Sequence, residues 1–215
     1  MLRDTLFTPK EEERATREGF GEGLVNAGTT DSRIVALCAD LTESVKMDGF
    51  RAKFPQRFFE VGITEQAMSG LASGMAAMGY IPFMASYAMF SPGRNWEQIR
   101  TTVAYNNVPV KVVGAHAGIS VGPDGATHQA IEDIAIMRMI PNMEVYVPCD
   151  AIEARAITEH IATSGKPAYL RLTREKTPLM VPDTYAWNHG KAYIMQIPKH
   201  KHGGEFMHKV GFIGC

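Results

Sequence analysis

Short apolar runs alternate along the chain with longer segments whose apolar residues recur at helical spacing. The runs have few polar interruptions, which is typical of strands buried on both faces of a parallel sheet. The pattern predicts strands at residues 34–38, 58–61, 81–84, 110–114, 143–147 and 168–172. It predicts helices at residues 8–27, 65–78, 93–105, 128–139 and 150–164. The alternation indicates an α/β fold: a doubly wound, mainly parallel sheet with helices on both faces.

Two of these helices begin with capping signals. Thr8 is followed by Pro9 and Glu11, and Asp150 by Glu153, so each start combines a capping side chain with an acid in the first turn. Gly28 is expected to end the first helix, because glycine readily adopts the left-handed conformation found after helices.

The pattern weakens after residue 178. Residues 1–178 are expected to form the α/β domain, and residues 179–208 a connecting segment and polar linker that includes a strand at 191–197. Residues 209–215 have the pattern of the first strand of a further domain that is otherwise absent from this chain. Three histidines of the linker do not have the spacing of a metal site, so no metal site is predicted; they are His200, His202 and His208.

Ligands of doubly wound sheets bind at the carboxyl ends of the strands, so the segments that follow the strands are where chemistry is expected. The most informative are residues 62–68 (GITEQAM) and 122–129 (GPDGATHQ). Glu65 falls in the first turn of a predicted helix, where an acid is favourable on electrostatic grounds alone. The second segment adds Asp124 and His128, which can hydrogen-bond and titrate.

Charge and cysteine content narrow the class of protein. The chain has 22 Lys and Arg against 23 Asp and Glu, without a basic run, so a nucleic-acid partner is not expected. The three cysteines are scattered, and neither a signal peptide nor an apolar run long enough to span a membrane is evident. A reducing cytoplasm is therefore the expected compartment.

Taken in order, the strand-end motifs resemble the middle, pyrimidine-binding domain of the transketolase family. The resemblance covers residues 5–174 and rests on Ala15-Thr16-Arg17, residues 39–44 (ADLTES), residues 62–68, His116, residues 122–129 and Thr173-Arg174. It implies a thiamine-diphosphate-dependent transketolase, which transfers a two-carbon ketol unit between sugar phosphates. Some members carry the diphosphate-binding domain on a separate chain, and this sequence resembles the C-terminal subunit of such a split enzyme.

The resemblance assigns a cofactor role to four residues. Glu65 would be the acid that faces the aminopyrimidine ring nitrogen, Phe90 and Tyr87 would stack on the ring, and Asp40 would complete the cofactor-binding set. Ordinary core packing is the alternative for the two aromatic residues. The third ring expected in this segment is missing, which leaves the role of Arg94 open.

The resemblance also assigns substrate roles. His128 would assist proton transfer, Asp124 would bind a substrate hydroxyl and His116 would orient the substrate. Arg17, Ser44 and Arg174 would bind the phosphate, because a guanidinium fits a phosphate in a forked geometry. A plain turn residue is the alternative for Asp124, and the role of Arg171 stays open.

The family's motif for the diphosphate, Gly-Asp-Gly followed by Asn-Asn, is not found in this chain. The resemblance therefore implies that thiamine diphosphate is shared with a diphosphate-binding, N-terminal transketolase subunit that also holds Mg²⁺ or Ca²⁺. Self-association is expected too, and the small residues of 70–79 would permit close helix packing.

Other readings remain open: a deoxyxylulose-phosphate synthase-like enzyme, the β-subunit of a 2-oxo acid dehydrogenase, or a non-catalytic partner that stabilises the thiamine subunit. The phosphate set Arg17 and Arg174, with His116, favours sugar-phosphate ketol transfer over the dehydrogenase. Glu65 argues against a non-catalytic role.

Overall fold

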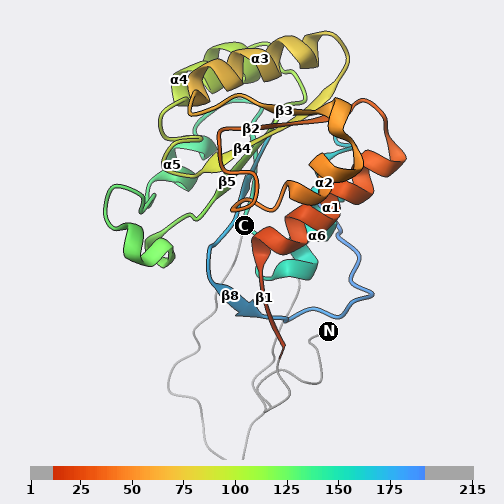
Figure 1. Cartoon of the computed structure of the whole chain (residues 1–215), viewed down its shortest axis with the longest axis vertical. Coiled ribbons are helices and arrows are strands. Elements are labelled where there is room, and N and C mark those ends of the chain that lie inside the picture. The colour runs from red at the N-terminus through yellow and green to blue at the C-terminus, as the bar shows by residue number, and fades with distance from the viewer. Residues whose placement is uncertain (1–11, 192–215) are drawn as a thin grey trace, which may run out of the picture.

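The computed structural model describes residues 12–191 of the chain, and its centre is a six-stranded sheet (Figure 1). All neighbouring strands of this sheet are parallel. In spatial order the strands are β3 (Phe58–Glu60), β2 (Ile34–Cys38), β4 (Ile81–Tyr87), β5 (Lys111–Ala115), β7 (Ala168–Arg171) and β6 (Glu144–Tyr146). The predicted parallel sheet is confirmed.

Helices cover both faces of the sheet, as the sequence pattern predicts (Figure 1). One face is covered by α1 (Thr16–Thr30), α2 (Asp48–Lys53) and α6 (Ala151–Ile161). The other is covered by α3 (Glu65–Ala77), α4 (Trp96–Gln98), the π-helical turn η2 (Ile99–Ala104) and α5 (Asp133–Arg138). Two 3₁₀ turns complete the set of helices in the described part of the chain: η1 (Pro55–Arg57) and η3 (Ile119–Asp124).

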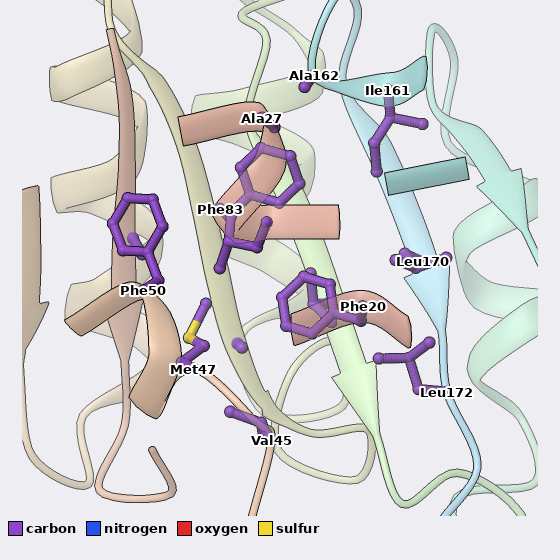
Figure 2. Close-up of a cluster of buried hydrophobic side chains, with 14 of the residues drawn as sticks. Phe20, Ala27, Val45, Met47, Phe50, Phe83, Ile161, Ala162, Leu170 and Leu172 are labelled. Atoms are coloured by element: carbon purple, nitrogen blue, oxygen red, sulfur yellow. The ribbon is translucent and has the colours of Figure 1, made fainter. Parts of the chain in front are cut away.

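Two apolar cores lie on opposite faces of the sheet, and strand β2 contributes to both. Ile34, Ala36 and Cys38 pack under α1, α2 and α6, together with Phe20 and Phe83 (Figure 2). The residues between them, Val35 and Leu37, pack under α3 instead. Because successive side chains of a strand point to opposite faces, burial on both faces requires an unbroken apolar run.

The first helix differs from its predicted bounds. It begins at Thr16 rather than at Thr8, and residues 13–15 form a short strand, β1 (Glu13–Ala15), antiparallel to β8 (Lys176–Pro178). The Thr16 hydroxyl accepts a hydrogen bond from the Thr173 backbone N–H, which ties the helix start to the segment after β7. The predicted capping box at Thr8 and Pro9 lies outside the described residues.

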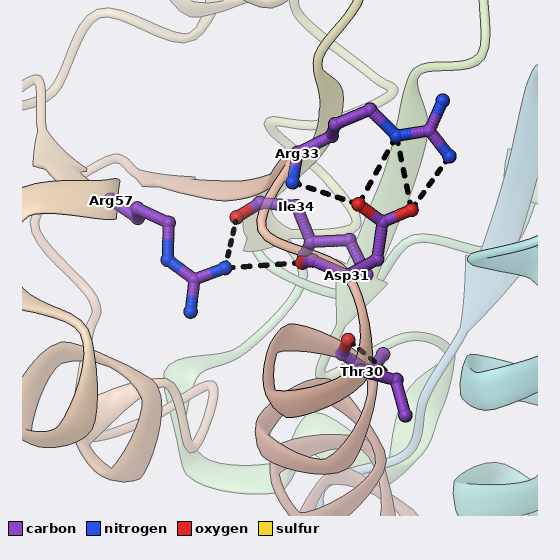
Figure 3. Close-up of polar contacts among 6 residues, drawn as sticks. Thr30, Asp31, Arg33, Ile34 and Arg57 are labelled. Carbon is purple, nitrogen blue, oxygen red and sulfur yellow. Dashed lines mark hydrogen bonds and ion pairs between the residues drawn. The ribbon is translucent and has the colours of Figure 1, made fainter.

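The C-terminal end of α1 also differs, because it runs past Gly28 to Thr30. Gly28 serves packing instead: a Cβ there would lie 2.5 Å from the Phe50 ring. Arg57 binds the carbonyl oxygens at this end of the helix: it donates to Gly28 in the last turn, to Asp31 just after it and to Ile34 of β2 (Figure 3 shows the last two). A distant guanidinium thus replaces the glycine cap that the sequence suggests.

Other helices also differ from their predicted bounds. The helix predicted for residues 128–139 is confined to α5, because Ala130 accepts a hydrogen bond from Gly118 and the preceding residues form a loop. The sequence pattern does not predict α2, η1, η3 or β8. The segment predicted as helix 93–105 forms α4 and η2.

The segment after β8 stays close to the domain. Leu179 and Val181 pack against Ala151 and Ile152 of α6. The predicted boundary at residue 178 stays a prediction, and the linker histidines and the strands predicted at 191–197 and 209–215 lie largely or wholly outside the described residues. Within residues 12–191, we find no helix with the length and apolar character needed to cross a bilayer.

The contact between α1 and α6 depends on glycine. A Cβ at Gly19 would lie 1.8 Å from the backbone oxygen of Ala151, so Gly19→Ala requires the two helices to separate. We expect this variant to lower the free energy of unfolding by at least about 2 kcal/mol, as overpacking does, in urea denaturation. Gly49→Ala is the matched control, because a Cβ there meets its nearest atom at an ordinary 3.5 Å; that change should be neutral or stabilising. Equal stability of the two variants would contradict the packing argument.

Candidate active site

The parallel pairing brings the segments after β2, β4, β5 and β7 to one edge of the sheet. These strands are neighbours, so the polar residues that follow them are neighbours too. The sequence prediction that the chemistry gathers at the carboxyl ends of the strands agrees with this arrangement.

Glu65 is the buried carboxylate of this edge. It begins α3 and is 1% exposed. Its Oε1 accepts a hydrogen bond from the Ser86 hydroxyl at 3.1 Å, and its Oε2 forms an ion pair with Arg94 at 3.0 Å. A buried carboxylate requires such partners, because burying a charge without them is costly.

Asn95 fixes the backbone around that carboxylate. Its buried side-chain amide donates to the carbonyl oxygen of Glu65 and lies within hydrogen-bond distance of the hydroxyls of Ser69 and Ser91. These contacts join the first turn of α3 to the segment after β4. The segment that carries Phe90 and Arg94 is thereby held against Glu65.

Arg94 lies between Glu65 and an aromatic face. Its guanidinium carbon is 4.9 Å from the centre of the Phe90 ring, while its Nη1 contacts the carboxylate of Glu65. Its side chain is 47% exposed, in contrast to the buried Glu65. The guanidinium therefore covers the space between carboxylate and ring, and it has solvent to move into.

Four predicted residues form one cluster of rings. Tyr87 stacks on His116 with ring centres 4.0 Å apart and lies parallel to Phe90 at 6.5 Å. His128 meets Phe90 edge to face at 5.1 Å. Tyr87, Phe90, His116 and His128 come from segments after two different strands, and the fold brings them together.

His116 is buried among positive charges. Burial is the main cause that lowers its pKa to about 4; the charges of Arg17 and Arg174 act in the same direction, and Asp124 opposes them. Arg17 approaches Nε2 of the imidazole at 3.2 Å. Because a guanidinium only donates, Nε2 accepts, and the neutral ring carries its proton on Nδ1. Within the described residues, this buried Nδ1 has no hydrogen-bond partner.

The predicted phosphate residues are partly engaged within the chain. Arg17 donates to the backbone oxygen of Ser44 at 2.9 Å as well as contacting His116, and its buried Nε has no partner among the described residues. Arg174 donates to the backbone oxygen of Val121 and so reaches the loop that contains Asp124. The fold brings Arg17, Ser44 and His116 together, and Arg174 lies near enough for its charge to lower the pKa of His116.

Asp124 and Asp40 occupy exposed positions at the same edge. Asp124 ends η3, and its charge acts on His116. Asp40 has a positive φ of 59°, and its backbone N–H donates to Oε1 of Glu60. Glu60 also accepts from Thr42 and from the Gly62 backbone, so it connects the loop after β2 to the turn before Glu65.

Sequence reasoning missed Ser86, Asn95 and Glu60 and left Arg94 open. Ser86 and Glu60 are polar residues at the last or second-last position of their strands, which is the signal that could have found them. Asn95 follows Arg94, and only the fold reveals that its amide contacts Glu65. Within the described residues we find no cluster of three or more metal-binding side chains.

The neutral state of His116 gives a pH prediction. Its pKa is lower in the folded chain (about 4) than in the unfolded chain (about 6.5), so the unfolded state binds more protons between these values. Stability is therefore complete above pH 6.5 and falls as the pH drops toward 4. We expect the wild type to lose more unfolding free energy than His116→Gln between pH 7 and 5 in urea titrations. Arg17→Met should raise the pKa of His116 in an NMR titration, and a wild-type midpoint near 6.5 would contradict this account.

Comparison with known proteins gives three informative relatives. The chain is 46% identical to a putative transketolase C-terminal section of Methanocaldococcus jannaschii, over 78% of this chain and 53% of that protein. It is 37% identical to a 6-deoxy-6-sulfo-D-fructose transketolase subunit, SqwH, of a Clostridium species, over 88% and 59%. A solved split-gene transketolase, described as an inactive β4 tetramer, superposes with a TM-score of 0.77 at 40% identity, over 86% and 59%. The chain thus spans little more than half the length of these relatives.

The family model for the transketolase pyrimidine-binding domain matches residues 12–180. This range contains the whole six-stranded sheet and every side chain of the candidate site described above. The chain therefore belongs to the transketolase family and contains its pyrimidine-binding domain.

Proposed function

We propose that this chain is a subunit of a thiamine-diphosphate-dependent transketolase, active only with a diphosphate-binding partner subunit. The observation that carries the proposal is the buried carboxylate of Glu65, which Arg94 connects to a cluster of aromatic and imidazole rings. A carboxylate buried at a helix start beside rings from other strands fits a heteroaromatic ligand better than it fits a structural role. The full lengths of the relatives support a larger enzyme than this chain.

The residues fit the aminopyrimidine of thiamine. When bound, thiamine diphosphate supplies a carbon nucleophile that the protein side chains lack. Glu65 would present Oε2 to the pyrimidine nitrogen, while Ser86 keeps Oε1 in place at 3.1 Å. Phe90 would lie against the ring. Arg94 has to leave this space first, and its half-exposed side chain permits that movement.

Two histidines would act on the substrate. Nδ1 of His128 lies 2.8 Å from the Thr127 hydroxyl, so Nε2 remains available to exchange a proton with a substrate oxygen. His116 would donate from its unpartnered Nδ1, since Arg17 occupies Nε2. Asp124, on the same loop, would accept a hydrogen bond from a substrate hydroxyl.

The arginines would bind the phosphate of a sugar-phosphate substrate. Arg17 and Arg174 place two permanent positive charges around His116, and Ser44 adds a neutral donor beside Arg17. Guanidinium groups suit phosphate because their N–H donors match two phosphate oxygens at once. Because His116 is neutral, the positive charge that would bind the phosphate comes from the two arginines.

The diphosphate and its metal ion would be bound by the partner subunit. Mg²⁺ or Ca²⁺ requires several oxygen ligands, and the described residues hold no cluster that supplies them. The surface around α3 is suited to assembly, because Ile63, Leu71 and Met78 are large apolar residues exposed by 69%, 50% and 80%. We assign this surface to contacts with the partner subunit or a second copy of the chain.

Reconstitution tests the proposal. The chain should be inactive alone and should transfer the ketol unit from xylulose 5-phosphate to ribose 5-phosphate after mixing with a diphosphate-binding subunit, thiamine diphosphate and Mg²⁺. In this assembly Glu65→Gln should lower kcat by at least about 100-fold, because the amide cannot exchange the proton. Folding should be retained, since glutamine can still accept from Ser86. Glu97→Gln, on the exposed surface of α4, is the matched control; a Glu65→Gln enzyme within a few-fold of wild type would refute the assignment.

The phosphate site gives a second prediction. Arg174→Ala should raise KM for ribose 5-phosphate roughly 10- to 100-fold, the cost of one lost charged hydrogen bond, in steady-state assays of the assembled enzyme. KM for glycolaldehyde, an acceptor without phosphate, should change little. Arg138→Ala provides the control, because Arg138 is exposed at the end of α5. An equal rise of KM for both acceptors would count against phosphate binding by Arg174.

A further inference from the structure

A buried network of three side chains lies under the loop that carries the proposed catalytic histidines. Asp133, at the start of α5, accepts on Oδ2 from the Tyr169 hydroxyl at 2.7 Å and from Nε of Arg171 at 2.8 Å. Asp133 is 2% exposed, Tyr169 is completely buried and the Arg171 side chain is 17% exposed. The network therefore connects two elements, β7 and α5, through a buried ion pair.

The phenol of Tyr169 is held in the protonated form in which it can donate. Burial raises the pKa of Tyr169 well above its usual value, and the neighbouring charge of Asp133 acts in the same direction. The phenol thus stays protonated and donates. Arginine retains its charge at any ordinary pH, so Asp133 has both a charged and a neutral donor on one oxygen.

The three side chains of the network lie next to both ends of the segment between β5 and α5. A Cβ on Gly118 would lie 2.9 Å from Nη2 of Arg171, so the guanidinium packs directly against the backbone there. A Cβ on Gly114 would lie 2.5 Å from the hydroxyl oxygen of Tyr169. Asp133 itself follows the far end of the loop, where the carbonyl oxygen of Ala130 accepts from Gly118.

The segment enclosed by these contacts, residues 115–132, is called here the histidine loop. His116, Asp124 and His128 all lie on it. His116 has a positive φ of 54°, a conformation that costs free energy in a residue other than glycine and needs support from the surrounding structure. Apart from backbone hydrogen bonds such as Ala117 N–H to Leu172 O, the support beneath Gly118 is the guanidinium of Arg171.

We propose that Arg171 and Asp133 are positioning residues that hold the histidine loop in its active geometry, and that Arg171 is not a phosphate ligand. This inference rests on the proposed function for its catalytic consequence, but not for its structural one. The guanidinium of Arg171 contacts Asp133 through Nε and the backbone at Gly118 through Nη2, whereas the buried Oδ1 of Asp133 has no hydrogen-bond partner among the described residues. A positioning role explains why an arginine lies within a buried strand, where an unpaired charge would be destabilising.

The test compares variants of the network with a control of similar burial. Asp133→Asn removes the charge with little change of shape, and the double variant Asp133→Asn/Arg171→Gln leaves no buried charge unpaired, so it folds even where the single variant does not. Lys111→Met is the control: Lys111 is fully buried at the opposite end of β5 and contacts Ser164 and Lys166, far along the strand from the histidine loop. Each variant is made in the full chain.

Two measurements separate positioning from general stability. Hydrogen exchange of amides 117–131, followed by mass spectrometry on the chain, should be roughly tenfold faster in both network variants and unchanged in Lys111→Met at matched stability. In the reconstituted enzyme, kcat should fall about 10- to 100-fold in the network variants, as expected for displaced catalytic groups, with the affinity for thiamine diphosphate within about twofold. Affinity should be preserved because Glu65 and Phe90 lie on other segments.

The outcomes are distinct. If kcat follows melting temperature alike in all variants, or if loop exchange does not change in the network variants, the positioning role is refuted. A selective rise of KM for phosphorylated acceptors would identify Arg171 as a phosphate ligand and would also refute it. If the wild-type assembly lacks ketol transfer, the proposed function fails, while faster exchange of the loop amides still decides the structural part of the inference.

Discussion

The site depends on one constraint, the parallel pairing of β2, β4, β5 and β7. This pairing places four strand ends on one edge, so Tyr87 at the end of β4 and His116 after β5 come into ring contact. Parallel strands require burial on both faces, and the two apolar cores provide it. The polar residues of the candidate site lie outside those apolar cores, at the strand ends and in the segments that follow them.

The sequence predicts the sheet well because its signal is local. A strand buried on both faces has an unbroken apolar run, as at residues 34–38, and the helix at Glu65 follows directly from the spacing of its apolar residues. The sequence pattern fails to predict the bounds of a helix where a residue distant in sequence determines them. Arg57 ends α1 in place of Gly28, and the β1–β8 pairing and the contact of Thr16 with Thr173 set its start. Neither partner is near in sequence, so no local pattern encodes them.

The contrast between local sequence patterns and contacts with distant residues also applies to the candidate site. The strand-end motifs, through their resemblance to the transketolase family, indicate Glu65, Tyr87, Phe90, His116 and His128, and the fold brings the last four into ring contact. The ion pair between Glu65 and Arg94 is not encoded in spacing, because it depends on how the segment after β4 folds over α3. That segment is fixed by Asn95, whose partners Ser69 and Ser91 have no recognisable motif.

The charged groups of the candidate site differ between its two ends. The carboxylate of Glu65 is buried and its guanidinium partner is half exposed; under the proposed function, a flat ring would take the place of Arg94 after that side chain moves into solvent or toward a partner chain. At the other end Arg17 and Arg174 remain positive around a neutral His116, which favours an anion. Between the two ends, His128 and Asp124 both lie on the histidine loop, so the distance between them depends on the conformation of that loop. The ion pair of Arg171 and Asp133, which we propose to position this loop, is buried beside it, with the two side chains 17% and 2% exposed.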